Sequence, residues 1–259
     1  MQEVEILRLK VGEKKADRVK DFVAQESALH IFLNRTFYAT ILCSPSNQKE
    51  LAIGHLLTEG IVRSIEEIEE VNVKAQTCKV KIKLDVNFKK RIRISRHSLR
   101  IILSECGGEQ AHKLLGRLPK IKSDLSVNAE TVVNCTSRLN SLAQTYMKTG
   151  GVHAAAIWTR DGVLVAIAED VGRHNAVDKT IGMAMILKTD LQHCFLTLTG
   201  RLTEDIVLKS AMANLQIVAS LAAATDSGIA LARKINLSLI GFVRGRRMNI
   251  YSAPERIRI

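Results

Sequence analysis

Hydrophobic and polar positions follow two different periods along the chain. Up to about residue 43 the apolar residues come in short runs separated by charged or Asn-containing breaks, which predicts strands over residues 4–9, 19–23, 29–33 and 37–43. Ser44-Pro45-Ser46 then supplies helix-start residues, and the apolar positions that follow recur with helical spacing until Gly60. The first part of the chain is therefore predicted to hold several strands and one amphipathic helix.

Two further segments, residues 79–84 and 91–94, alternate between apolar residues and Lys or Arg. A period of two predicts strands with one apolar and one basic face. We interpret the basic face as a solvated outer surface, since lysines also discourage pairing at a strand edge. A nucleic-acid surface is the weaker interpretation because no aromatic residues interleave with the charges to stack on bases.

Polar residues 119–125 interrupt the periodicity and predict a domain boundary, which divides the chain into residues 1–120 and 121–259. The second part begins with a helix from Asn128 to Gly150 and a hairpin whose strands are joined by Arg160-Asp161-Gly162. Alternating helical and strand patterns follow, which predicts an α/β (α+β) fold. The expected elements are a helix after Gly172, a strand over 194–199, a helix from 204 to about 224, a short helix over 227–234, and strands over 237–243 and 248–252.

Three of these predicted strands end in glycine and arginine, at Gly172-Arg173-His174, at Gly200-Arg201 and at Arg244-Gly245-Arg246-Arg247. Glycine allows close backbone approach, arginine makes bidentate contacts with oxyanions, and the first junction also opens a helix. If the strands point the same way, the arginines converge on a site for a pyrophosphate or dinucleotide, and otherwise they scatter. Neither a G-x-G-x-x-G nor a G-x-x-x-x-G-K-[ST] motif is present, which disfavours ordinary Rossmann and P-loop sites.

Cysteine usage singles out Cys106. The chain has five cysteines and no C-x-x-C pair, which argues against a disulfide framework or a structural zinc site. Cys106 is followed by two glycines and is expected in an exposed loop, where a thiol can act as a nucleophile or sulfur carrier. Glu105 and Glu109 oppose a lowering of its pKa. The others fall in core-like strand or helix patterns: Cys43, Cys78, Cys135 and Cys194.

The overall charge points to an anionic partner. A formal net charge of +12 and a pI near 9.7 fit nucleic acid, a nucleotide, a phosphorylated cofactor or an acidic protein. No apolar run is long enough to span a membrane, and the N-terminus lacks the apolar core of a signal peptide, so a cytoplasmic location is expected.

Several longer segments of the chain form recognisable motifs. They are Leu51-Ala-Ile-Gly-His-Leu-Leu-Thr-Glu-Gly-Ile61, Thr149-Gly-Gly-Val-His153-Ala-Ala, Glu169-Asp-Val-Gly-Arg-His-Asn-Ala-Val-Asp-Lys179, Thr199-Gly-Arg-Leu202 and Gly241-Phe-Val-Arg-Gly-Arg-Arg-Met-Asn-Ile-Tyr251, followed by Pro254-Glu-Arg256. In these segments the chain resembles the FdhD/NarQ family of formate dehydrogenase accessory sulfurtransferases, and the resemblance covers nearly its whole length. It implies a cytidine-deaminase-like α/β domain preceded by a smaller, strand-rich domain.

The resemblance also implies a function. A family member takes sulfur as a persulfide from a cysteine desulfurase and passes it to the bis-molybdopterin guanine dinucleotide cofactor of formate dehydrogenase. Cys106 would carry the persulfide, GDP-like nucleotides could mimic the cofactor, and a homodimer is possible. The family's cofactor-binding loop would fall on Phe242, Val243, Arg244, Gly245, Arg246 and Arg247, and we add Arg173, Arg201 and His153 as candidate cofactor-binding residues.

One departure from the family keeps an alternative open. Where the family commonly has C-G-x-C-G, this chain has Cys106-Gly-Gly-Glu109, with a single cysteine. The alternative is a cofactor-binding chaperone without persulfide chemistry of its own. Zinc-dependent deamination is disfavoured because His153 is followed by Ala154-Ala155 where that chemistry requires a Glu, and no C-x-x-C follows. No metal site is expected.

Overall fold

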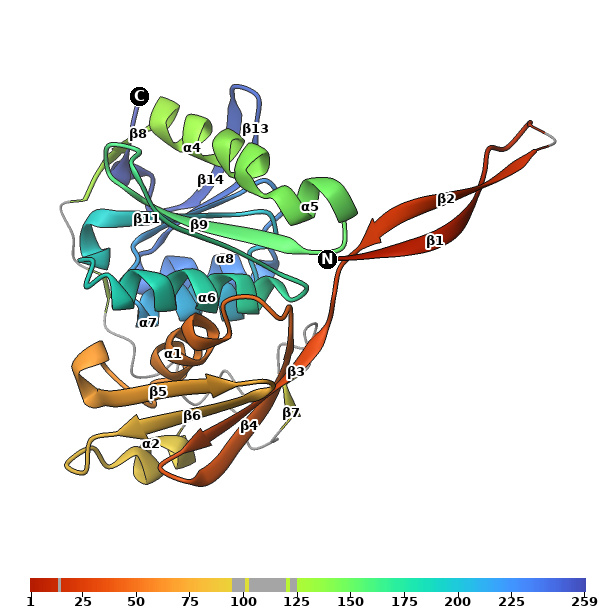
Figure 1. Cartoon of the computed structure of the whole chain (residues 1–259). Coiled ribbons are helices and arrows are strands. Elements are labelled where there is room, and N and C mark those ends of the chain that lie inside the picture. The colour runs from red at the N-terminus through yellow and green to blue at the C-terminus, as the bar shows by residue number, and fades with distance from the viewer. Residues whose placement is uncertain (14, 95–100, 103–119, 122–124) are drawn as a thin grey trace.

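The protein is described by a computed structural model over residues 1–13, 15–94, 101–102, 120–121 and 125–259 (Figure 1). Cys106 and its neighbours lie outside the described residues. None of the described helices is both long and apolar enough to cross a membrane.

The N-terminal part contains a projecting hairpin and a mixed sheet. Strands β1 (Gln2–Leu9) and β2 (Ala16–Val23) pair antiparallel in a ribbon that extends away from the body (Figure 1). The sheet that follows has the order β5-β6-β3-β4-β7, and α1 packs against it. Its elements are β3 (Ser27–Leu33), β4 (Thr36–Cys43), α1 (Gln48–Thr58), the short 3-10 helix Ile65–Glu67, β5 (Ile68–Lys74), β6 (Thr77–Ile82), α2 (Phe88–Ile94) and β7 (Ile101–Ile102).

The C-terminal part is built on a second sheet with the order β10-β9-β11-β12-β13-β14. Helix α4 packs on one face through a core that includes Trp158, and α6, α7 and α8 pack on the other. The main elements are α4 (Ala129–Leu142), α5 (Gln144–Thr149), β9 (His153–Thr159), β10 (Leu164–Asp170), α6 (Arg173–Ile186), β11 (Cys194–Leu198), α7 (Glu204–Met212), β12 (Ile217–Ser220), α8 (Asp226–Ile235), β13 (Ser238–Arg244) and β14 (Arg247–Ser252). A small parallel pair joins β8 (Val127–Asn128) to β15 (Ile257–Arg258), and the 3-10 helices Leu191–His193 and Pro254–Arg256 lie between elements.

Helices α1 and α6 join the two parts at very close range. A Cβ at Gly54 would overlap the backbone carbonyl of Asp178, and one at Gly182 would overlap the carbonyl of Glu50. Two glycines facing each other therefore let the helix backbones touch. One continuous apolar core runs from the N-terminal sheet through α1 to α6, α7 and α8. The predicted boundary near residue 120 stays a prediction, and the parts on either side of it share this core.

A buried ionic network lies beside the glycine contact. Lys209 of α7 donates to Asp178 at 2.8 Å and to the hydroxyl of Thr58 at 3.0 Å, and Nδ1 of His55 lies 3.3 Å from Asp178. Burial opposes the ionisation of Asp178, but Lys209 and His55 outweigh this and lower its pKa. The network satisfies the charges that α1, α6 and α7 bury against one another.

The predicted strand over residues 91–94 is wrong, since these residues belong to helix α2. The side chain of Asn87 accepts from the backbone N–H of Lys90 at 3.1 Å, and the guanidinium of Arg91 pairs with Glu67. Asn is a favoured helix-start residue. Four alternating residues fit the period of a helix as well as that of a strand. The capping hydrogen bond at Asn87 therefore determines that this segment forms a helix.

The predicted long helix over residues 204–224 is also wrong. Helix α7 ends at Met212, Asn214 adopts a positive φ of 59°, and the central strand β12 follows. All four residues of β12 are buried between parallel neighbours. Such strands show no polar alternation, so their continuous apolar run also fits the continuation of a helix.

Candidate functional site

Three strands that precede the arginine-bearing junctions point the same way. Strand β9 lies between β10 and β11 and is antiparallel to both, whereas β11, β12 and β13 are parallel to one another. The carboxyl ends of β10, β11 and β13 therefore reach the same edge of the sheet, where α/β proteins commonly bind ligands. The three strands thus point the same way, which is the condition for their arginines to lie along one edge of the sheet.

His153, Gly200 and Arg173 lie side by side at this edge. A Cβ at Gly200 would lie 2.8 Å from the Cβ of Arg173 and 3.5 Å from Nδ1 of His153. That imidazole nitrogen also lies 3.4 Å from the hydroxyl of Thr199. Glycine at position 200 therefore leaves the space in which the arginine and histidine side chains approach each other.

Electrostatics at His153 favour a neutral imidazole. Burial lowers its pKa below the ordinary value, and the positive charges of Arg173 and Arg201 lower it further, while Asp170 opposes them. The side chain is thus a hydrogen-bonding group near two cations. An anionic ligand between these groups would find donors and positive charge together.

The N-terminus of α6 adds backbone donors to the cluster. Gly172 caps this helix and provides no side chain, and Arg173 is its first residue. Unpaired N–H groups and the helix dipole make such a start a favourable place for negative charge. His174 follows, with Nε2 4.0 Å from a carboxylate oxygen of Asp205 on α7.

Other polar residues of the segment 169–179 are buried and stabilise the fold around the site. Asp170 is fully buried, accepts from the backbone N–H of Ser44 and of Gly172, and pairs with the buried Lys179. Asn175 donates to the same carboxylate at 2.9 Å. This part of the motif thus fixes the β10–α6 turn onto the N-terminal part, and Arg173 and His174 remain partly exposed at this edge of the sheet.

The loop between β13 and β14 carries the arginine-rich segment. Arg244 and Arg247 face each other across a turn in which Gly245 has a φ of +59°. Nε of Arg244 donates to the carbonyl of Leu221, and its guanidinium lies 5.8 Å from the ring centroid of Phe242. Val243 is buried, whereas Arg244, Gly245, Arg246 and Arg247 are exposed, so the loop presents charge and backbone to solvent.

The end of β12 and the residues after it link the edge at Arg173 and Arg201 to the arginine-rich loop that follows β13. The hydroxyl of Ser220 donates to the carbonyl of Gly200 at 2.6 Å, and the carbonyl of Ala222 accepts from the backbone N–H of Phe242 at 3.0 Å. Phe242 itself has a φ of +51°, an uncommon conformation for an aromatic residue. The sequence prediction of a helix over β12 hides this connecting segment, and the small-residue run Ala222-Ala223-Ala224 is the available signal for it.

The described cysteines are unsuited to sulfur chemistry. Cys43, Cys78, Cys135 and Cys194 are buried, as their patterns predicted. Burial raises the pKa of Cys43 and of Cys78 to about 12, and that of Cys135 and of Cys194 to about 11. All four are thus thiols at neutral pH, and the prediction for Cys106 rests on the sequence. Among the residues that the structure describes, no group of three or more His, Cys, Asp or Glu side chains could hold a metal ion.

The chain is similar to known proteins over its whole length. The model of the FdhD/NarQ family matches residues 24–258. The "Sulfur carrier protein FdhD" of Sulfolobus acidocaldarius is 34% identical over 99% of this chain and 98% of that protein, and the protein of the same name from Shouchella clausii is 32% identical over 98% and 96%. The crystal structure of a putative formate dehydrogenase accessory protein from Desulfotalea psychrophila aligns with a TM-score of 0.81 and 26% identity, and covers 99% of both chains.

Proposed function

Since the chain belongs to the FdhD/NarQ family, we propose that it is a sulfur carrier that serves formate dehydrogenase. In this proposal it accepts sulfur from a cysteine desulfurase and delivers it to the bis-molybdopterin guanine dinucleotide cofactor. The names of the relatives support the sulfur-carrying and accessory roles. The cofactor, the desulfurase and the residue assignments are our extension to this chain.

The observation that carries the proposal is the alignment of three arginine-bearing strand ends along one sheet edge. Arg173 and Arg201 with the α6 N-terminus suit one phosphate group, and the loop from Phe242 to Arg247 suits further phosphate or a guanine ring. Gly200 lets the side chain of Arg173 pack closely against its backbone at this edge, beside His153. This donor set fits the pyrophosphates of a guanine dinucleotide, which supplies the molybdenum centre that receives sulfur.

The proposed sulfur step uses Cys106. Its thiolate attacks the terminal sulfur of the desulfurase persulfide, a new S–S bond forms, and the desulfurase cysteine leaves as a thiolate. Release of the terminal sulfur as sulfide then requires a thiol as the two-electron reductant, which becomes a disulfide with Cys106. The neutral His153 is a hydrogen-bonding group that holds the anionic ligand without adding a third fixed charge.

A cofactor-binding chaperone without persulfide chemistry is the second candidate, favoured by the single cysteine in Cys106-Gly-Gly-Glu109. Both candidates share the remaining expectations. These are a cytidine-deaminase-like fold for the six-stranded sheet and its helices, a homodimer, a cytoplasmic location and binding of GDP as a mimic of the cofactor.

Two measurements test the proposal. Intact-mass spectrometry after incubation with a cysteine desulfurase and cysteine should detect one added sulfur on the wild type and none on Cys106→Ser. Calorimetric titration should detect GDP binding that weakens in Arg201→Ala and persists in Cys106→Ser. Sulfur on neither protein, with GDP binding intact, would replace the carrier by the chaperone, and the absence of both signals would overturn both candidates.

A further inference from the structure

Strand β10 forms an open edge of the six-stranded sheet. The backbone N–H of Thr199 donates to the carbonyl of Ala154, so Ala154 turns its polar groups toward β11 and Ala155 turns its own toward β10. Because this direction alternates along antiparallel strands, Ile167 directs its N–H and C=O groups away from the sheet, and Glu169 directs its N–H the same way. The carbonyl of Glu169 accepts from Nζ of Lys179 at 3.3 Å. Within the described part of the chain, no strand pairs with that side of β10.

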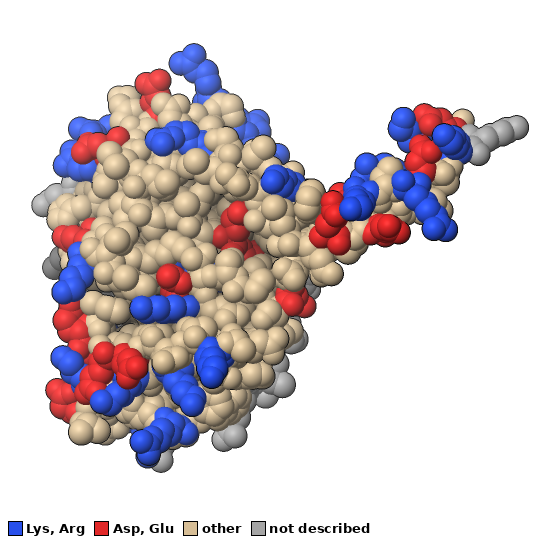
Figure 2. Space-filling view, in the orientation of Figure 1, with Lys and Arg blue, Asp and Glu red and all other residues tan. Residues whose placement is uncertain are grey.

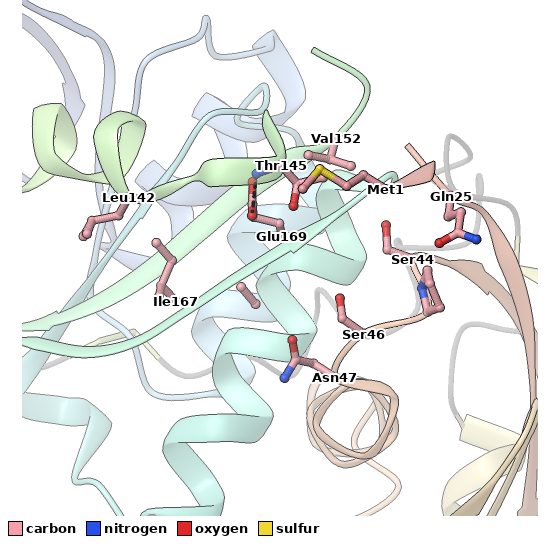
Figure 3. A pocket seen from close by; sticks show the side chains of 12 residues that line it. Met1, Gln25, Ser44, Ser46, Asn47, Leu142, Thr145, Val152, Ile167 and Glu169 are labelled. Carbon is pink, nitrogen blue, oxygen red and sulfur yellow. Dashed lines mark hydrogen bonds between the residues drawn. The ribbon is translucent and has the colours of Figure 1, made fainter. Parts of the chain in front are cut away.

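A groove runs beside this edge (Figure 3). It has a volume of about 370 Å³ and lies between β10, the α4–α5 corner and the segment 44–47 that leads into α1. Ile167 and Leu142 line one end, whereas Ser44, Ser46 and Asn47 line the other. Exposed strand edges are templates for pairing with another chain, and here the edge opens into a space that can take side chains.

The groove carries few charged groups, which are the amino group of Met1 and the carboxylate of Glu169. Among the described residues that line it, Glu169 is the one with an ionisable side chain, and its carboxylate accepts from the backbone N–H groups of Thr145 at 3.1 Å and Tyr146 at 2.7 Å. Figure 2 shows that the surface over α4, β9 and α6 also carries few charged side chains, while the projecting hairpin and the N-terminal sheet carry many. In a chain with a formal charge of +12, such a strip does not suit nucleic acid or a phosphorylated ligand.

We propose that the β10 edge and this groove bind an extended, uncharged segment of the catalytic subunit of formate dehydrogenase by adding it as a strand to the sheet. This inference rests on the proposed function. Main-chain hydrogen bonds to the N–H and C=O of Ile167 and to the N–H of Glu169 supply affinity in this binding mode, and alternate side chains enter the groove and supply specificity. The segment carries an apolar side chain opposite Leu142 and Ile167, and small polar side chains opposite Ser46 and Asn47.

The groove lies close to the sheet edge at which the cofactor is expected to bind. Strand β10 continues through Asp170 and Gly172 into Arg173, at the edge where the cofactor is expected to bind. A segment aligned on β10 therefore leads toward the same edge. The client enzyme is then tethered beside the site from which it receives its cofactor, which raises the effective concentration of one for the other.

Hydrogen–deuterium exchange of the full-length wild-type chain with the cofactor-free catalytic subunit tests the proposal. The amides of residues 164–170 should gain protection on complex formation. A complex that protects other segments and leaves these amides unchanged overturns the β10 contact while the accessory role survives. If no complex forms, both the contact and the proposed partner are wrong.

Two variants at position 167 distinguish the contribution of the backbone hydrogen bond to binding from that of the side chain. Ile167→Pro removes the outward N–H at an edge position, where sheets tolerate proline, and should weaken the complex by roughly ten-fold. Ile167→Val keeps the N–H and should bind within about two-fold of the wild type. GDP affinity should be unchanged in both. Equal affinities of the proline and valine variants would overturn the strand-addition mode, and if the proline variant does not fold, the exchange experiment decides.

Discussion

The Nζ of Lys179 lies 2.6 Å from a carboxylate oxygen of Asp170, and both side chains are fully buried beneath the β10–α6 turn. The same carboxylate holds the backbone N–H of Ser44, so this pair fastens the N-terminal part to the candidate site. Breaking a buried pair by removing one partner leaves an uncompensated charge.

Asp170→Ala should therefore reduce the free energy of unfolding by about 3–5 kcal/mol, measured by urea denaturation. The double variant Asp170→Leu with Lys179→Met should recover part of the loss, since it removes both charges and retains volume. A single variant as stable as the wild type would show that the pair contributes nothing.

Gly54→Ala should destabilise the protein by about 3 kcal/mol although alanine is the better helix former by about 1 kcal/mol. The new Cβ would meet the backbone carbonyl of Asp178, which cannot move aside without shifting α6. Denaturant unfolding measures the change. Ala230→Gly on the exposed side of α8 is the control and should cost about 1 kcal/mol from helix propensity alone. An unchanged or raised stability in Gly54→Ala would contradict the close helix contact.

Gly200→Ala should weaken GDP binding by about ten-fold, because the Cβ would displace Arg173. If the glycine acts through the arginine, its effect should largely vanish in an Arg173→Ala background. Calorimetric titration of the two single variants and the double variant checks this. Fully additive losses would show that Gly200 acts on the ligand by another route.

Stability should fall as the pH drops below the ordinary histidine value of about 6.5, in part because of His153. Its pKa is lowered in the folded state, so the unfolded chain binds the proton more readily and the folded state loses stability in this range. Urea denaturation between about pH 7 and 5 should show a shallower dependence for His153→Asn. Binding of the anionic GDP should tighten over the same range in the wild type alone. Parallel profiles for the two proteins would contradict the lowered pKa.

A thiol reagent at about pH 8 should modify at most one cysteine of the native chain. Cys43, Cys78, Cys135 and Cys194 are buried thiols with raised pKa values and should react only after denaturation. Spectrophotometric titration counts the reactive groups, and Cys106→Ser should remove the fast one. Two or more fast groups in the native wild type would contradict the burial of the other four.

Local signals in the sequence were sufficient for the hairpin around Asp161-Gly162, the start of the helix that Asn128 caps, and the strands that alternate apolar and polar residues. The single helix predicted from Asn128 to Gly150 is instead two, α4 and α5, which separate at Ala143. The local signals failed at β12, where burial on both faces removes the alternation, and at α2, where four residues fit both periods. Arginine and glycine at three strand ends were visible in the chain. That the strands point the same way depends on pairing between distant segments, which no local pattern encodes.

The structural roles of the charged residues within 169–179 could not be predicted from the sequence either. Asp170, Asp178 and Lys179 look like surface charges in the sequence, yet each is buried against a partner from a distant element. Their burial depends on α1 and α7 packing against α6. Sequence reasoning could therefore identify the motif and could not separate its binding residues from its structural ones.

The contact between α1 and α6 also constrains how the protein is made. His55 meets Asp178, which follows it by 123 residues. At about 5–20 residues/s, a ribosome needs roughly 6–25 s to add the intervening segment. During that time the buried face of α1 lacks the helix that will cover it. The nascent N-terminal half therefore exposes this apolar face until α6 has been synthesised, and completion of its fold has to wait for the C-terminal half.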